Sequence, residues 1–315
     1  MPTATGVEID AAYRVLREGA GFLDRPRGIL RVTGAEAAGL LQGQLTNDVE
    51  ALDPGRGCYA ALLDRKGHMQ ADMRVLRLAA GELRLDTAPE ALAAIVRHMR
   101  MYGVGRDAEV EDASGDWAVV SVIGPRAVEA IGAEIRAPEH AHREVDLDGI
   151  AALAAATDLG VDLIFPAPAA AEVRELLEAA GAVATSEAAA EVVRVESGRP
   201  RFGKEMTRRT IPAEAHINER AVSFTKGCYI GQETVARLHY KGRPNRHLRG
   251  LRLAAPVTDG DPVRLGEREL GTIGTAVVSP VHGPIALAIL RREAEPGAAV
   301  TVGDAVAAEV VEPPF

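Results

Sequence analysis

Segments typical of strands and segments typical of helices do not alternate regularly along this chain. The strand-like stretches include GILRVTG, CYAALLD, ADMRVLRL, ELRLDT, WAVVSVIG and VDLIFP. Two of them, ADMRVLRL and ELRLDT, follow each other across residues 79–81 with no helical pattern between them, as in a β-hairpin. A doubly wound parallel sheet needs a helix between consecutive strands. The order of segments therefore predicts an α+β fold.

The length of the chain indicates more than one domain. With 315 residues and 47% hydrophobic side chains, the chain is too long for one ordinary core and suits two or three domains. From Leu248 onwards, glycine, proline and valine dominate and helical patterns disappear. This composition predicts a small antiparallel barrel or sandwich at the C-terminal end.

Two threonines mark the predicted starts of helices. Thr33 precedes Glu36 by three positions and Thr87 precedes Glu90 by three, which is the spacing of a capping box. The apolar faces of the two helices would be formed by Ala37, Leu40, Leu41 and Leu45 and by Leu92, Ile95, Val96 and Met99. The stretch EVEDASGD is predicted to be a connector.

The chain carries only two cysteines, Cys58 and Cys228, which excludes a disulfide framework and favours a reducing compartment. Two thiolates are too few for an ordinary iron–sulfur cluster or a structural zinc site within one chain. His140 and His142 in EHAHRE are the closest histidine pair, and an alternating pair in a polar loop is typical of a surface. No metal site is predicted.

The N-terminal residues lack the basic start and apolar run of a secretory signal. The most apolar stretch, residues 150–165, is interrupted by Asp158 and Asp162, so it does not read as a membrane span. We expect a cytoplasmic protein without a membrane partner.

The most informative motif is KGCYIGQE at residues 226–233. It places Cys228 between a glycine and a tyrosine, two positions after Lys226. A cysteine that fills a core needs apolar neighbours, whereas a reactive thiol needs positive charge nearby and a small neighbour that admits a partner. The motif favours a functional thiol, with a structural role as the alternative. Cys58 is followed by the apolar AALL stretch, which favours a small structural role in a strand.

A basic segment follows the motif. Residues 234–258 contain no acidic side chain, and their basic residues are Arg237, Lys241, Arg243, Arg246, Arg249 and Arg252. Within a chain of net charge -9, this reversal of sign would attract an anion, and a solvated basic strand and loop is the alternative. The overall negative charge disfavours direct nucleic-acid binding.

Glu196 lies at the end of a helical pattern in RVESGRPRFGKEM, residues 194–206. A glutamate at a helix end is usually solvated. Here several basic residues follow it, and residues 196–240 hold four aromatic residues, Phe202, Phe224, Tyr229 and Tyr240. These side chains would suit a planar ligand with a donor edge and a negative tail. Reduced folate is such a ligand, because a carboxylate can accept two parallel hydrogen bonds from its pterin.

Three stretches together, LTNDVEALDPGRGCYAALLDRKGHMQADMRV, RVESGRPRFGKEM and SFTKGCYIGQETVARL, resemble the folate-binding YgfZ proteins, relatives of the glycine cleavage aminomethyltransferase (GcvT). The resemblance runs in order over nearly the whole chain, and KGCYIGQE is specific to the YgfZ branch. It implies interleaved α+β units and a C-terminal β-barrel around a central folate site. The expected domains are residues 1–245, the folate-binding region, and residues 246–315, the barrel.

The resemblance also implies roles for individual residues. Glu196 would be the pterin-binding carboxylate, and Asp72 matches the essential aspartate of GcvT, although Ala71 stands where GcvT has a second acid. Tyr59 matches a tyrosine of the same region, and Asn47 with Asp48 matches a shared loop. From proximity in the sequence, Phe224 and Tyr229 are candidates for the walls of the folate site and Arg237 for its tail.

The YgfZ branch implies a tetrahydrofolate-binding accessory protein for assembly or repair of iron–sulfur enzymes, including tRNA-modifying ones. Its partners would be folate and iron–sulfur client or assembly proteins, with Cys228 and Lys226 as the functional pair. The alternative is a tetrahydrofolate-dependent aminomethyltransferase that uses Asp72.

Overall fold

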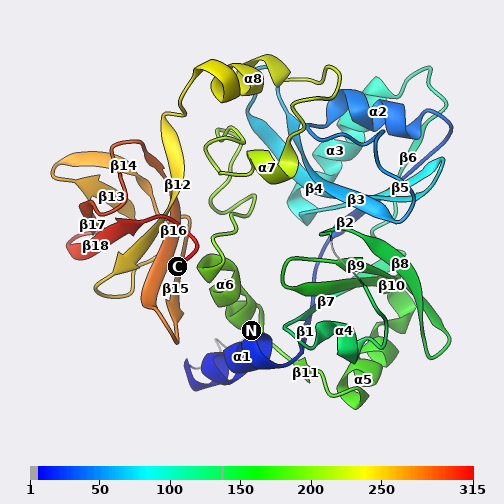
Figure 1. Ribbon diagram of the computed structural model, residues 1–315, viewed down its shortest axis with the longest axis horizontal. Helices are drawn as coiled ribbons and strands as arrows, with labels where there is room; N and C mark the ends of the chain where they lie inside the picture. Colours follow the sequence, from blue (N-terminus) through cyan, green and yellow to red (C-terminus); the bar gives the residue numbers. More distant parts are fainter. Residues whose placement is uncertain (1–5, 136–137) are drawn as a thin grey trace. The chain divides into compact units, whose positions relative to one another are not determined.

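The computed structural model describes residues 6–135 and 138–315, whose contacts divide the chain into two compact units (Figure 1). The first unit comprises the chain up to Leu63, Gln70–Glu187 and Arg220–Ile230. The second comprises Asp64–Met69, Ala188–Glu219 and Gly231–Phe315. The two units are thus interleaved along the sequence, and the expected boundary between residues 245 and 246 stays a prediction.

The first unit contains a five-stranded sheet in the order β3-β4-β5-β2-β6. Its strands are β2 Gly28–Thr33, β3 Arg56–Leu63, β4 Met69–Ala79, β5 Glu82–Thr87 and β6 Glu109–Asp112. The predicted hairpin is confirmed, because β4 and β5 pair antiparallel up to Ala79 and Glu82. Two helices, α2 Ala37–Gln44 and α3 Pro89–Tyr102, supply buried side chains to the same core as the sheet.

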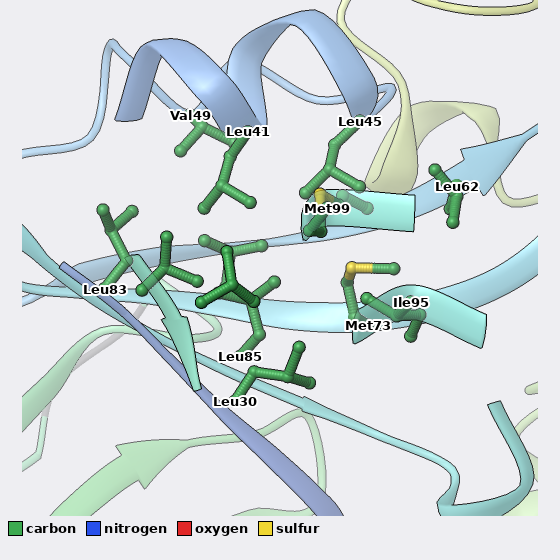
Figure 2. Close-up of a cluster of buried hydrophobic side chains, with 14 of the residues drawn as sticks. Leu30, Leu41, Leu45, Val49, Leu62, Met73, Leu83, Leu85, Ile95 and Met99 are labelled. Atoms are coloured by element: carbon green, nitrogen blue, oxygen red, sulfur yellow. The ribbon is translucent and has the colours of Figure 1, made fainter. Parts of the chain in front are cut away.

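This core explains why the helices form where the sequence predicts them. Figure 2 shows Leu41 and Leu45 facing the sheet residues Met73 and Leu85, with Ile95 and Met99 of α3 in the same cluster. The apolar side chains recur at the spacing of one helical face and alternate along the strands. The apolar faces of the helices and of the sheet are therefore buried against each other.

A six-stranded sheet, in the order β11-β1-β7-β10-β9-β8, forms the rest of the first unit. Its strands are β1 Gly21–Asp24, β7 Trp117–Ile123, β8 His142–Leu147, β9 Ile150–Ala156, β10 Gly160–Pro166 and β11 Val183–Ala184. The accompanying helices are α1 Gly6–Glu18, α4 Ala127–Ala130, the short 3-10 helix η1 Ala167–Ala169 and α5 Ala170–Ala179. A cluster that includes Ile29, Leu76, Val119 and Ile164 packs the two sheets of this unit against each other.

The second unit is built around a seven-stranded antiparallel sheet in the order β14-β13-β17-β18-β12-β16-β15. Its strands, yellow to red in Figure 1, are β12 Arg246–Leu253, β13 Pro262–Leu265, β14 Arg268–Thr272, β15 Thr275–Ser279, β16 Gly283–Arg291, β17 Ala299–Val302 and β18 Val306–Val311. The sheet curls, since a Cβ at Gly271 of β14 would lie 2.9 Å from Ile289 O of β16. No pairing joins the edge strands β14 and β15 within the described residues, so the sheet is a half-barrel.

The remaining helices are α6 Glu187–Glu196, α7 Asn218–Ala221 and α8 Gln232–Lys241. Val195 of α6 packs with Leu248, Ile285 and Leu287, so α6 lies against β12 and β16. The α+β prediction, with a C-terminal antiparallel sheet, is confirmed.

Both predicted capping boxes are wrong. Helix α2 begins after Glu36, which is its N-cap and makes no side-chain cap hydrogen bond, because Glu36 instead accepts from the Asp107 backbone N–H. Helix α3 begins after Ala88, and the Thr87 hydroxyl donates to the Asp72 carbonyl. In both places a tertiary contact takes the side chain that a cap would need.

One other segment prediction is wrong in part. The stretch EVEDASGD is not only a connector, since residues 109–112 form β6 at the edge of the first sheet, paired with β2. In the basic segment, Arg237 and Lys241 lie on α8, and the arginines from Arg246 to Arg252 lie on β12. Arg249, on β12, is buried and donates to Glu312 Oε2 at 2.9 Å.

Candidate functional site

Tyr59 and Asp72 meet in the first unit, on the neighbouring strands β3 and β4. The Tyr59 hydroxyl donates to Asp72 Oδ2 at 2.6 Å. Burial, and then the negative charge of Asp72, raise the pKa of Tyr59. Burial also raises the pKa of Asp72, although the Tyr59 hydrogen bond and the charge of Arg27 act in the opposite direction. A buried carboxyl group with a raised pKa is a candidate for proton transfer.

A network of charged side chains lies close to Tyr59 and Asp72. Asp86 accepts from Arg27 Nε at 2.8 Å and from Arg74 Nε at 2.6 Å. Arg74 also donates to Asp162 Oδ2 at 2.8 Å, which joins the two sheets of the first unit. Burial alone would raise the pKa of Asp86, but the two arginines lower it. Ion pairs buried in this way cost desolvation energy, and such groups cluster at functional sites.

These residues line a cavity of about 250 Å³ within the first unit. The walls are Arg25, Arg27, Tyr59, Arg74, Asp86, Val119, Ser121, Ile123, Glu139, His140, Thr157, Asp158, Leu159 and Asp162. They come from both sheets, and they combine an aromatic ring with acids and bases. The cavity is therefore suited to a polar ligand of small size or to part of a larger one.

The prediction that His140 and His142 lie on the surface is wrong. His140 lines the cavity with a side chain that is 12% exposed, and His142 is buried at the start of β8. Burial lowers the pKa of His140 to about 4, so its imidazole is neutral at pH 7. Its backbone takes the left-handed conformation, with φ 70°, while its N–H donates to Ala156 O at 2.8 Å. Tertiary pairing with β9 thus draws a polar loop inward.

Lys226 is buried, at 8% exposure, and its ammonium forms three hydrogen bonds. Nζ donates to the carbonyls of Gln42 at 2.7 Å, Leu45 at 2.7 Å and Asn47 at 2.9 Å. The carbonyls of Gln42 and Leu45 lie at the C-terminal end of α2, where carbonyls lack intrahelical donors and a cation is favourable, and that of Asn47 lies in the turn that follows. Burial lowers the pKa of Lys226 to about 8. With all three N–H groups used, Lys226 anchors the loop that carries Cys228.

Cys228 is exposed, whereas Cys58 is partly buried beside the core of the first sheet. Burial raises the pKa of Cys58 to about 12, so this thiol is inert at neutral pH. Beside Cys228, a Cβ added to Gly227 would meet nothing within 4 Å, so the space at this glycine is open. Tyr229, on the other side, is buried, with Lys226 Nζ 5.1 Å from its ring centroid.

Glu196 lies in the second unit at the C-terminal end of α6, as predicted. It is 3% exposed, and its Oε1 accepts from the Ser279 hydroxyl at 2.5 Å. Its backbone carbonyl accepts from the Phe315 N–H at 3.0 Å. The carboxylate is thus held between α6 and the end of β15.

The structure brings together some of the predicted site residues within one unit. Tyr59 and Asp72 are in contact, and Lys226, Cys228 and Tyr229 share a loop of the same unit with Phe224. Tyr59 lines the cavity, while Phe224 and Tyr229 are not among its lining residues in the described parts of the chain. Glu196 and the exposed Arg237 belong to the second unit.

Sequence reasoning missed the charged residues of the cavity, namely Arg25, Arg27, Arg74, Asp86, Glu139, Asp158 and Asp162. A signal was present for one of them, Arg74. Asp72 and Arg74 alternate in ADMRVLRL, so they share one face of β4, and charges at this period in an otherwise apolar strand indicate a buried polar site. That Asp86 is the partner of Arg74 follows only from the register between β4 and β5.

Within residues 6–135 and 138–315, no group of three or more His, Cys, Asp or Glu side chains is placed to hold a metal ion. No helix in this described part is long and apolar enough to cross a membrane.

The chain is similar to proteins of known family. The model of the GCVT N-terminal domain matches residues 5–226. An aminomethyltransferase of Saccharopolyspora erythraea is 31% identical over 331 aligned residues, which cover 97% of this chain and 89% of that protein. An uncharacterized protein of Haemophilus influenzae is 30% identical over 224 residues, covering 69% of this chain and 68% of that protein.

A solved structure has the same fold. The glycine cleavage system aminomethyltransferase T from Bartonella henselae superposes with a TM-score of 0.88 at 20% identity, covering 100% of this chain and 91% of that one. At this identity the likeness concerns the fold. By the extent of the domain match and the identity to its relatives, this chain belongs to the GCVT N-terminal domain family.

Proposed function

We propose that this protein binds a reduced folate, tetrahydrofolate or a one-carbon derivative, and serves as an accessory protein for iron–sulfur enzymes. The observation that carries the proposal is the exposed thiol of Cys228, on a loop anchored by the buried Lys226 in the same unit as the cavity that Tyr59 lines. A cavity with acid–base groups suits ligand binding, and an accessible thiol suits transfer to or from a partner protein.

In this proposal Glu196 binds the donor edge of the pterin, as a carboxylate does with paired N–H groups. Tyr59, Phe224 and Tyr229 offer flat surfaces to the ligand, and Arg237, exposed on α8, attracts the glutamate tail. Binding through Arg237 would weaken as salt rises, since its charge is exposed.

Cys228 would act on a client protein. As a thiolate it can ligate iron in transit, or attack a client disulfide, so that one mixed disulfide forms and the client's second sulfur leaves as a thiolate. Lys226 supports either role by holding the loop. Iron–sulfur clients that modify tRNA fit this role, and the tRNA itself need not be bound.

A second candidate function is aminomethyl transfer to tetrahydrofolate. The raised pKa of Asp72 and its contact with Tyr59 favour it, because a carboxyl group of this kind can handle the proton of a reacting amine. Ala71, next to Asp72, stands where GcvT has a second acid, and this argues against it.

Two experiments test the proposal. Titration of the purified protein with tetrahydrofolate, followed by an assay with an aminomethylated carrier protein, separates the functions: binding without turnover supports the accessory role, and turnover supports the transferase. Complementation in cells that lack this protein then compares Cys228→Ser with Cys58→Ser as a matched control. If Cys228→Ser restores iron–sulfur enzyme activity as well as the parent does, the thiol role is wrong.

A further inference from the structure

Asn47 joins two segments that are far apart in the sequence. Its side-chain amide donates to the Tyr59 carbonyl of β3 at 2.8 Å and to the Arg220 carbonyl of α7 at 3.0 Å. Its Oδ1 accepts from the Asp48 backbone N–H at 2.9 Å, which fixes the orientation of the amide. Both N–H groups and the oxygen of this side chain are therefore used.

The preceding residue, Thr46, makes a parallel set of contacts. Its buried hydroxyl donates to the Ala221 carbonyl at 2.6 Å and accepts from the Ala61 N–H at 2.9 Å. Its backbone carbonyl accepts from the Ser223 N–H at 3.0 Å. Thr46 and Asn47 thus bind the start of the Cys228 loop to β3 at successive positions, and Asn47 is the one that reaches Tyr59.

The same residue also receives the anchor of the loop. Lys226, two positions before Cys228, donates to the Asn47 carbonyl at 2.9 Å. The loop is consequently tied to the turn after α2 at both Arg220 and Lys226, and Asn47 takes part in both attachments.

Asn47 also fixes the backbone of Tyr59, the aromatic residue of the cavity wall. Tyr59, whose carbonyl Asn47 binds, donates its hydroxyl to Asp72. The Arg220 guanidinium lies 5.3 Å from the centroid of the Tyr59 ring and pairs with Glu139, another residue of the cavity wall. Asn47 therefore binds the backbone carbonyls of Tyr59 and of Arg220, and the Arg220 guanidinium lies over the Tyr59 ring.

We propose that Asn47 is a positioning residue that holds the Cys228 loop and the Tyr59–Asp72 pair in one common frame. The inference rests on the proposed function, in which the thiol and the folate cavity serve one activity. Asn47 itself touches no reacting atom, and it acts through the backbone of Tyr59 and of Arg220.

The test variant is Asn47→Asp, which keeps the shape of the side chain but sets a carboxylate against two carbonyl oxygens. A protonated aspartate can donate one of the two lost hydrogen bonds, so the defect should diminish as pH falls. Asn245→Asp is the matched control, because Asn245 is exposed and precedes β12 in the second unit. The probes are tetrahydrofolate for the cavity and iodoacetamide for Cys228, followed by mass spectrometry of the alkylated peptide.

At about pH 8 we expect Asn47→Asp to bind tetrahydrofolate about tenfold more weakly than the control and to be alkylated at Cys228 about tenfold faster. As pH is lowered to about 5.5, the affinity for tetrahydrofolate and the alkylation rate of Asn47→Asp should both approach those of the control. A general loss of stability would show no such recovery, since acid weakens most folded proteins. Asn47→Ala, which removes the donors without adding charge, should give both changes with no recovery, and it replaces Asn47→Asp if that variant does not fold.

The outcomes separate this inference from the proposed function. If the parent binds tetrahydrofolate and both Asn47 variants bind it equally well, or if alkylation of Cys228 is unchanged, the positioning role is overturned. If neither the parent nor the control binds tetrahydrofolate, the proposed function is overturned, and the alkylation rates still decide whether Asn47 holds the loop.

Discussion

Arg74 on β4 and Asp86 on β5 lie opposite each other in register, and Arg74 Nε donates to Asp86 Oδ2 at 2.6 Å. Arg74 reaches on to Asp162 in the second sheet of the same unit, so one guanidinium connects both sheets below the cavity. The Tyr59–Asp72 pair depends on this arrangement, because it lies on the adjoining strands of the first sheet.

Replacement of Arg74 by methionine should destabilise the first unit strongly. The change leaves Asp162 without its arginine and Asp86 with Arg27 alone, a defect that costs about 3–5 kcal/mol. Urea unfolding followed by fluorescence of Trp117, the one tryptophan of the chain and a residue of β7, measures the free energy of unfolding. The control Arg126→Met removes an exposed pair with Glu129 and should leave the free energy of unfolding nearly unchanged. Similar losses in both variants would contradict the role of Arg74.

Acid should weaken the first unit partly through His140. Its pKa is lowered to about 4 in the folded state, from an ordinary value of 6.5, so the unfolded chain binds more protons between these values. Stability is therefore lost as pH falls, and His140 should account for about 2 kcal/mol between about pH 7 and pH 5. His140→Asn tolerates the left-handed backbone and should lack this part of the pH dependence in urea unfolding.

A matched control for His140 is His216→Asn, since His216 also has a positive φ, of 56°, but lies in the second unit. His216→Asn should leave the urea unfolding transition reported by Trp117 fluorescence the same as in the parent, at about pH 7 and at about pH 5. An identical pH dependence in the parent and in His140→Asn would show that His140 is not the titrating group.

Lys226→Arg and Lys226→Met should both loosen the Cys228 loop. A planar guanidinium cannot direct three N–H groups at the converging carbonyls of Gln42, Leu45 and Asn47, and methionine has no donor. We expect alkylation of Cys228 to rise about tenfold in both variants, with little change in Lys241→Met, on the exposed end of α8. If Lys226→Arg matches the parent and Lys226→Met reacts more slowly, Lys226 acts through its charge on the thiol instead.

Glu196→Gln should weaken tetrahydrofolate binding by about tenfold, because a charge-assisted contact with the pterin is replaced by a neutral one. Ser279→Ala removes a hydrogen bond to the Glu196 carboxylate and leaves its charge, so it serves as the control and should affect binding far less. Isothermal titration calorimetry measures both. Loss of stability in both variants with unchanged affinity would mean that Glu196 only fastens α6 to the C-terminal sheet.

Several strands and helical faces could be predicted from the sequence because each depends on neighbours within a few residues, although β6 was not. The hairpin at residues 79–81, the face of α3 and the end of α6 at Glu196 all follow from local spacing. The helix starts could not be predicted in the same way, since Glu36 and Thr87 bind distant backbone groups instead of capping.

The exposed thiol and its lysine could be singled out by composition, but their relation could not. The sequence suggested that Lys226 lies beside Cys228 to activate it, whereas the folded chain directs its ammonium to carbonyls 179 to 184 residues earlier. The buried His140 and the Arg74–Asp86 contact likewise depend on strand register. Sequence by itself determined the elements and the reactive residue types, because these follow from local chemistry. Only the tertiary structure decided which charges meet, because burial and pairing across distant segments set the partner and the pKa of each group.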